Sequence, residues 1–427
     1  MGEKPYLAGR VAVRVFLCFA AAYVLSYAFR SVNAVIAPAL IEDLHLSNAD
    51  LGLLTSAYFL SFACLQLPLG IWLDKYGPRK TETALLILAA IGAAIFAVST
   101  SLTGLWIGRA LIGAGVSACL MASFKAYRMW FAPERQSQLA SWMLVAGSSG
   151  ALLATTPVTA VMPLIGWRGV FWVMAGLIML AAAAIFFLMK DVETERDAVD
   201  LLFREADNAG ARAASGQGYG TIFRNPDFRG MALLGLINHG SFLALQTLWA
   251  GPWMVTVLKM SSAESAQILF VFNLCLMLGF VLFGWWAPRK VTIDGARGWS
   301  TAQAVTVGLF GTLLLQAAIL TTTAAWSWLL WIPLAIFMTV TTLVQSHVSL
   351  SFPTALAGRA STAYNLLLFI GAFSVQWGIG LLIDAFKLRG ASPILAMQSA
   401  FALCLALQSA GLIAFVLHRI QTARSTT

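Results

Sequence analysis

Long apolar runs, each of about 20 residues, constrain the fold of this chain more than any other feature. A helix of that length crosses a hydrocarbon core of about 30 Å, whereas an apolar run of about 10–14 residues is more typical of a buried core helix. The composition agrees, because 59% of the 427 residues are hydrophobic and only 11% are charged. The sequence therefore predicts an all-α membrane protein embedded in the lipid bilayer.

Twelve such runs can be placed along the chain, and the first is too long for the core of a signal peptide. It continues from Val11 past Ala34, so we expect no cleavage. The expected membrane spans lie near residues 11–38, 51–73, 81–99, 103–127, 138–160, 167–189, 230–256, 264–286, 299–320, 325–350, 361–383 and 394–418.

Positive charge is distributed unequally between the two sides that these spans define. With the N-terminus placed inside, 21 of the 27 Lys and Arg residues fall on the cytoplasmic side, four on the outer side and two within spans. Because Lys and Arg concentrate on the cytoplasmic side of membrane proteins, both termini are expected inside. The same distribution accounts for the net charge of +9 without a nucleic-acid partner.

A polar segment of mixed charge over residues 191–228 divides the spans into six and six. Its content of Gly, Ala and Ser is typical of a linker. We therefore expect an N-terminal six-helix bundle over 1–190, a cytoplasmic linker over 191–228 and a C-terminal six-helix bundle over 229–427. Two such halves are typical of a duplicated transporter with its substrate site between the halves.

The loop between the second and third spans holds the most specific pattern in the chain, Gly-Ile-Trp-Leu-Asp-Lys-Tyr-Gly-Pro-Arg-Lys over residues 70–80. Gly70 allows another helix to approach closely, and Gly77 before a proline predicts a tight turn. At the membrane boundary the Asp74 carboxylate needs a helix N-terminus or an arginine as its partner. A degenerate copy without the aspartate occupies residues 284–290 in the second half. The alternative interpretation is an ordinary interfacial loop.

This loop resembles the signature loop of the major facilitator superfamily, and the resemblance extends over nearly the whole chain. It implies twelve helices in two pseudo-symmetric halves, with Asp74 and Arg79 helping to latch the cytoplasmic side shut. Arg109, followed by glycines, resembles the arginine of the fourth-helix motif. The antiporter motif of drug exporters is not matched, since Gly147 and Gly150 lack an adjacent Gly-Pro pair, and this favours uptake.

Within the superfamily, residues 27–33 (Tyr-Ala-Phe-Arg-Ser-Val-Asn) are similar to the organophosphate:phosphate antiporter branch. The resemblance gives Arg30 the place of the helix 1 arginine that binds the substrate phosphate. The second arginine of that branch, on helix 7, has no counterpart in residues 243–246 (Leu-Ala-Leu-Gln). A doubly charged phosphate ester is therefore not expected.

Arg30 is the sharpest candidate on physical grounds as well. It lies about 22 Å along the first helix, where an arginine costs about 2.5–3.5 kcal/mol unless it faces a cavity or a partner. Tyr23, Tyr27 and Arg30 share one helix face, with Asn33 at its edge. A planar guanidinium beside aromatic rings suits a carboxylate or another small anion. The alternative is that Arg30 snorkels or bonds helix carbonyls.

Polar and aromatic residues on helices 7 and 11 could complete the substrate site or merely hold helices together. Because all 18 Asp and Glu, Glu82 included, are placed in loops or at span ends, we do not expect a buried carboxylate relay. Histidines are the alternative proton carriers. Arg109, a candidate gating residue with Gly70, Asp74, Gly77 and Arg79, is placed near the outer interface, where an arginine can snorkel. It could bond neighbouring backbone or act on protons or substrate. The residues concerned are His239, Gln246, Trp249 and Trp253 on helix 7, Asn365 and Gln376 on helix 11, and His239 and His347 as proton-coupling candidates.

These patterns predict a secondary transporter of the bacterial inner membrane that takes up a small organic anion with protons or by exchange. We expect a monomer without cofactor, metal or nucleic acid. The two alternatives are an exporter of amphipathic compounds and a ligand sensor with the same fold that does not transport. An enzyme is not expected, because the spans show no nucleophile–base pair or metal cluster.

Overall fold

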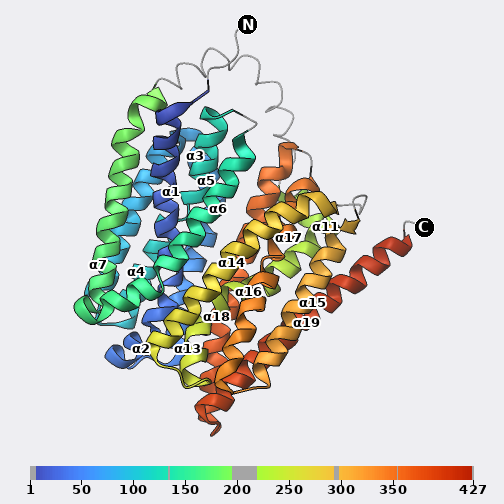
Figure 1. Ribbon diagram of the computed structural model, residues 1–427. Coiled ribbons are helices and arrows are strands. Elements are labelled where there is room, and N and C mark those ends of the chain that lie inside the picture. The colour runs from blue at the N-terminus through green and yellow to red at the C-terminus, as the bar shows by residue number, and fades with distance from the viewer. Residues whose placement is uncertain (1–5, 133–134, 195–218, 293–297, 353, 426–427) are drawn as a thin grey trace.

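The computed structural model describes residues 6–132, 135–194, 219–292, 298–352 and 354–425, and almost all of them are helical (Figure 1). Within these residues ten helices are long and apolar enough to span a membrane. Two of the ten contain a break, at Gly77 (φ 77°) in α3 and at Gly166 (φ 65°) in α7. The break in α3 separates two crossings, and the part of α7 before Gly166 joins α6 (Gln136–Leu153) in another crossing. The described helices therefore form twelve crossings, as predicted, and the turn expected at Gly77 is confirmed.

In the first half, α1 (Gly9–Ser31) and α2 (Asn33–Leu44) form one crossing, and α3 (Asn48–Val98) forms two. Next, α4 (Leu102–Gly115) and α5 (Cys119–Trp130) form the fourth crossing. The fifth and sixth crossings are built from α6 (Gln136–Leu153) and α7 (Thr156–Leu188).

The second half begins with the short α10 (Tyr219–Arg224) and a seventh crossing that starts at Pro226, three residues before the predicted boundary. Most of the predicted linker, residues 195–218, lies outside the described residues. The seventh crossing consists of α11 (Pro226–Leu234), η2 (Gly235–His239), α12 (Gly240–Ala244), η3 (Leu245–Trp249) and α13 (Ala250–Thr256).

The remaining crossings follow the predicted order, with several helices a few residues longer than predicted. Two-residue strands β1 (Val291–Thr292) and β2 (Trp299–Ser300) pair in parallel between the eighth and ninth crossings. These crossings are α14 (Ser262–Lys290), α15 (Thr301–Leu320), η4 (Ala325–Leu330) with α16 (Trp331–Met338) and α17 (Thr341–Leu350), α18 (Thr354–Leu388) and α19 (Pro393–Ser425).

Local sequence explains several of the helix starts and the apolar outer surface. Ser47, Ser261 and Ser300 each cap a helix in a reciprocal capping box, which fixes where crossings two, eight and nine begin. Large apolar side chains on the perimeter are exposed, for example Leu164 at 83% and Phe187 at 69%. Such a surface is stable only against lipid, so the chain is an integral membrane protein.

The two halves meet at one end of the molecule and diverge at the other (Figure 1). We call the end with α2 and α13 the closed end, and the end with the Gly77 break the open end. At the closed end, Asp384 of α18 accepts hydrogen bonds from the backbone N–H groups of Asn48 (3.3 Å) and Ala49 (2.6 Å) at the start of α3. Gly380 lies against the same turn, where a Cβ would be 2.3 Å from the Asn48 carbonyl oxygen.

Candidate functional site

Arg30 lies at the break between α1 and α2, in contact with both halves of the molecule. Its guanidinium carbon is 4.5 Å from the ring centre of Tyr27, 5.8 Å from that of Tyr58, and 5.6 Å from those of Phe62 and Phe369. Phe369 belongs to α18, so the second half contributes to this aromatic cage. The side chain is 8% exposed, and its Nε has no hydrogen-bond partner among the described residues. Arg30 therefore does not snorkel; it is held inside the protein.

The other residues predicted beside Arg30 lie close to it. Tyr23 packs edge-on against Tyr27 at 5.0 Å between ring centres, and Gly147 of α6 lies against both rings. Asn33, on the far side of the break, is fully buried and donates from Nδ2 to Thr55 Oγ1 at 2.9 Å. Its Oδ1 has no partner within the described part of the chain.

Arg109 is placed differently from the prediction that it lies near the interface and snorkels. It is fully buried, and Nη1 donates to the Phe29 carbonyl oxygen at 2.9 Å, next to Arg30. The guanidinium also lies 5.5 Å from the ring centre of Tyr58. The expectation of snorkelling is wrong because α4 packs along α3, and this turns the Arg109 side chain inward. The alternative of a bond to neighbouring backbone is present.

The seventh crossing does not keep the predicted face of His239, Gln246 and Trp253. These side chains contact three different helices. His239 is half-buried and lies close enough to Arg30 of α1 for the two side chains to interact electrostatically. Gln246 donates to Asn273 of α14 at 3.0 Å, and Trp253 stacks on Phe401 of α19 at 4.7 Å between ring centres. The reason is the two π-helical turns, η2 and η3, each of which shifts the helix phase.

Trp249 and Gln376 belong to the contact that shuts the closed end. Trp249 is fully buried, and its Nε1 donates to the Gln376 carbonyl oxygen at 3.0 Å. Both pack against Gly52 of α3, where a Cβ would lie 2.9 Å from the Gln376 carbonyl oxygen. The Gln376 side-chain Oε1 is buried without a partner among the described residues.

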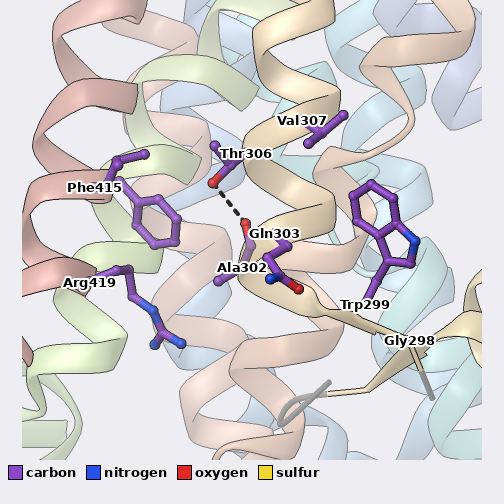
Figure 2. A pocket seen from close by; sticks show the side chains of 9 residues that line it. Gly298, Trp299, Ala302, Gln303, Thr306, Val307, Phe415 and Arg419 are labelled. Carbon is purple, nitrogen blue, oxygen red and sulfur yellow. Dashed lines mark hydrogen bonds between the residues drawn. The ribbon is translucent and has the colours of Figure 1, made fainter. Parts of the chain in front are cut away.

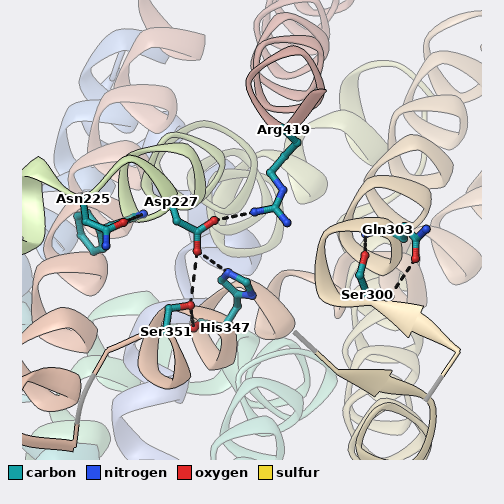
Figure 3. Close-up of polar contacts among 8 residues, drawn as sticks. Asn225, Asp227, Ser300, Gln303, His347, Ser351 and Arg419 are labelled. Carbon is teal, nitrogen blue, oxygen red and sulfur yellow. Dashed lines mark hydrogen bonds and ion pairs between the residues drawn. The ribbon is translucent and has the colours of Figure 1, made fainter. Parts of the chain in front are cut away.

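Asn365 and His347 make contacts within the second half. Asn365 accepts a hydrogen bond from Gln345 of α17 at 3.3 Å. At the open end, His347 Nε2 lies 2.8 Å from Oδ2 of Asp227, whose other oxygen accepts from Arg419 at 2.8 Å (Figure 3). This cluster ties the ends of α11, α17 and α19 together, and no contact joins it to Arg30 in the described structure.

The signature loop lies at the open end, and its ion pairs among the described residues are with the first half. Asp74 pairs with Lys125 of α5 at 2.6 Å, and Arg79 pairs with Glu193 just after α7. Gly70 is exposed, and a Cβ there would meet nothing within 4 Å. The predicted close approach of another helix to Gly70 is therefore absent in this conformation, because the halves are apart at this end.

The latch remains a prediction, and substitution of Asp74 tests it. Asp74→Asn removes the charge that would attract the partner half without changing the side-chain volume. We expect normal folding and a transport rate reduced about tenfold, since one charge-assisted hydrogen bond contributes about 1.5–3 kcal/mol. The control is Glu42→Asn, which alters an exposed acid at the closed end. A wild-type rate in Asp74→Asn would show that Asp74 is only an interfacial charge.

A groove of about 650 Å³ lies at the open end between α15 and α19 (Figure 2). It shares no residue with the surroundings of Arg30, so it is not part of the candidate site. Its lining consists of Gly298, Trp299, Ala302, Gln303, Thr306, Val307, Phe415, Val416 and Arg419.

Two kinds of residue in the bundles were missed by the sequence reasoning. Tyr58 and Phe62, four residues apart on the second span, could have been found as an aromatic pair, but Phe369 could not, because it lies in the other half. Glu82 was assigned to a span boundary, yet it is fully buried. Its place near the end of a span is as predicted, but its burial was not predicted, because α5 covers it.

Comparisons with known proteins agree with this geometry. A family model described as Major Facilitator Superfamily matches residues 19–375. A solved bacterial homologue of the human lysosomal transporter Spinster, in an inward-facing and occupied conformation, has a TM-score of 0.71 at 17% identity, covering 98% of both chains.

Several curated relatives are transporters whose names specify organic anions. The chain is 27% identical to the hexuronate transporter of Escherichia coli (strain K12), over 62% of each chain. It is 27% identical to the galacturonate transporter of Dickeya chrysanthemi, over 61% of this chain and 77% of the relative. The probable sulfoacetate transporter SauU of Cupriavidus necator is 25% identical over 81% of this chain and 80% of its own. The match to the hexuronate transporter thus spans less than two thirds of that relative.

Proposed function

The chain belongs to the major facilitator superfamily, and from this premise we propose that it moves a small hydroxylated organic anion of the sugar-acid class across the bacterial inner membrane by alternating access. The proposal extends to uptake, coupled to protons or to exchange. Because both halves of one chain surround Arg30, we propose a monomer.

The observation that carries the proposal is the environment of Arg30. A buried guanidinium is costly unless a counter-charge or hydrogen-bond acceptor offsets its desolvation. Within the described residues Arg30 has aromatic rings around it and no carboxylate partner. A bound carboxylate would supply the missing charge, with two parallel hydrogen bonds to the planar guanidinium.

Further buried polar atoms without partners support a ligand with several hydroxyl groups. Such atoms usually find a partner in a folded protein, so those left without one are available to a polar ligand or to water. They come from both halves, which is expected of a site between them. Among the described residues they include Arg30 Nε, Asn33 Oδ1, His239 Nδ1, Tyr364 Oη and Gln376 Oε1.

Binding of two matched sugars to the purified protein tests the substrate class. D-galacturonate and D-galactose differ only in a carboxylate in place of a hydroxymethyl group. We expect galacturonate to raise the midpoint of thermal unfolding by several degrees, since a ligand at 100 times its Kd stabilises by about 2.7 kcal/mol. Galactose should leave the midpoint unchanged. Equal stabilisation by both sugars would show that the carboxylate does not contribute to binding, and this would contradict the proposed substrate class.

The proposed orientation places the open end in the cytoplasm, and reporter fusions test it. Fusions at Ser215 and Thr427 should both report cytoplasm, because the positively charged segments stay on that side. A fusion after Gly390, in the turn between α18 and α19 at the closed end, should report the opposite side. An outer signal from Ser215 or Thr427 would overturn the orientation.

A further inference from the structure

Glu82 is an unusual residue in the first half, because its carboxyl group is buried without a charged partner. The residue is fully buried, and neither carboxylate oxygen has a hydrogen-bond partner among the described residues. It lies five residues past the break at Gly77, or roughly 7 Å along the third crossing. The carboxyl is therefore close to the open end but sealed from it.

Each group that faces Glu82 is neutral or already paired. The Cys119 thiol of α5, a weak hydrogen-bond donor, lies beside the Glu82 carboxyl, and the Tyr127 phenol of α5 is also nearby. On the α1 side of Tyr127 is the Cys18 thiol. Tyr127 itself donates to the sulfur of Met143 in α6 at 3.3 Å.

The nearby charges on α3 and α7 offset each other. Arg79, one turn before Glu82 on α3, pairs with Glu193 just after α7. Its Nη1 donates to the Phe186 carbonyl oxygen of α7 at 3.0 Å. Among the described residues no cation is therefore paired with Glu82, and an ionised carboxylate there would cost several kcal/mol. The protonated, neutral form is the stable one in this conformation.

A series of polar side chains connects Glu82 with the candidate substrate site. Cys119 interacts with Glu82 on one side and with Ser26 of α1 on the other. Ser26 Oγ lies 3.5 Å from Tyr58 Oη, and the Tyr58 ring is part of the cage around Arg30. Movement of α1 on substrate binding would thus displace Cys119, which covers Glu82.

We propose that Glu82 is the proton-binding site that couples transport to the proton gradient, a role that rests on the proposed function. One proton from water binds one carboxylate oxygen and forms an O–H bond. The same O–H bond breaks, and the proton returns to water, when a second conformation exposes the carboxyl. His347 is less suited to this role, because it is tied to Asp227 away from Arg30.

The transport test uses Glu82→Gln, which imitates the protonated side chain. In proteoliposomes, galacturonate accumulation driven by a pH gradient should fall at least tenfold, whereas exchange of internal for external galacturonate without a gradient should continue. Glu42→Gln, at an exposed acid, is the matched control and should accumulate normally. Gradient-driven accumulation at the wild-type level in Glu82→Gln would overturn the proposal. A folded variant that loses both accumulation and exchange would overturn it as well.

A second measurement needs no substrate, so its failure is distinct from failure of the proposed function. The infrared spectrum of the wild-type protein at pH 7 should contain a C=O band of a protonated carboxyl, absent from Glu82→Gln. If the variant does not fold, labelled and unlabelled wild-type protein can be compared instead. Labelling with ¹³C-glutamate should then shift the same band. Absence of a protonated glutamate band at pH 7 would refute the proposal whatever the protein transports.

Discussion

Arg30→Ala should abolish binding of galacturonate while the protein still folds and reaches the membrane. The substitution removes the cation that contacts all four rings of the cage, Tyr27, Tyr58, Phe62 and Phe369. Arg109, which also lies against Tyr58, stays bonded to the Phe29 carbonyl oxygen. Titration of the purified variant with galacturonate measures the effect.

Arg30→Lys separates charge from geometry. Lysine keeps the positive charge but loses the two-pronged planar contact with a carboxylate. Affinity should fall by about 1–3 kcal/mol, or roughly 5- to 150-fold. Arg168→Ala, which removes an exposed arginine paired with Asp43 at the closed end, is the control and should bind normally. Wild-type affinity in Arg30→Ala would contradict the assignment of the site.

Gly380→Ala should prevent the closed end from shutting. The added Cβ would lie 2.3 Å from the Asn48 carbonyl oxygen, a backbone atom that cannot rotate away. The first half would have to separate from α18 there, which also breaks the hydrogen bonds of Asp384. We expect transport to fall at least tenfold, with the population shifted towards a conformation open at that end.

Gly378→Ala is a matched control for Gly380→Ala, because a Cβ at Gly378 would meet nothing within 4 Å. Spin labels at the exposed residues Leu164 and Leu388 report the separation of the two halves at the closed end, with the exposed Cys64 replaced by serine. The distance between the labels should increase in Gly380→Ala and stay unchanged in Gly378→Ala. An unchanged distance in both variants would argue against this contact as the closing surface.

The twelve crossings could be predicted because span length depends on one physical quantity, the thickness of the hydrocarbon core. The break at Gly77 was predictable too, since glycine readily adopts the positive φ of a turn and the proline after it interrupts the preceding helix. The cluster of Tyr23, Tyr27 and Arg30 follows from helix periodicity within a single element. These are all local properties of the sequence.

What could not be predicted depends on contacts between elements. The burial of Arg109 and Glu82 is decided by the helices that cover them, and each lies near a span end in the sequence. The two π turns of the seventh crossing separate His239 from Trp253, and nothing in the hydrophobic pattern reveals them. Phe369 joins the cage only because α18 packs against α3.

Counterflow in proteoliposomes tests transport of an anion most directly. Vesicles that contain the purified protein and a high concentration of unlabelled galacturonate should take up labelled galacturonate from outside, transiently above its external concentration. Labelled galactose should not enter, and vesicles with Arg30→Ala should take up neither sugar. Binding of galacturonate without exchange of label would contradict transport and would indicate a ligand sensor with the same fold.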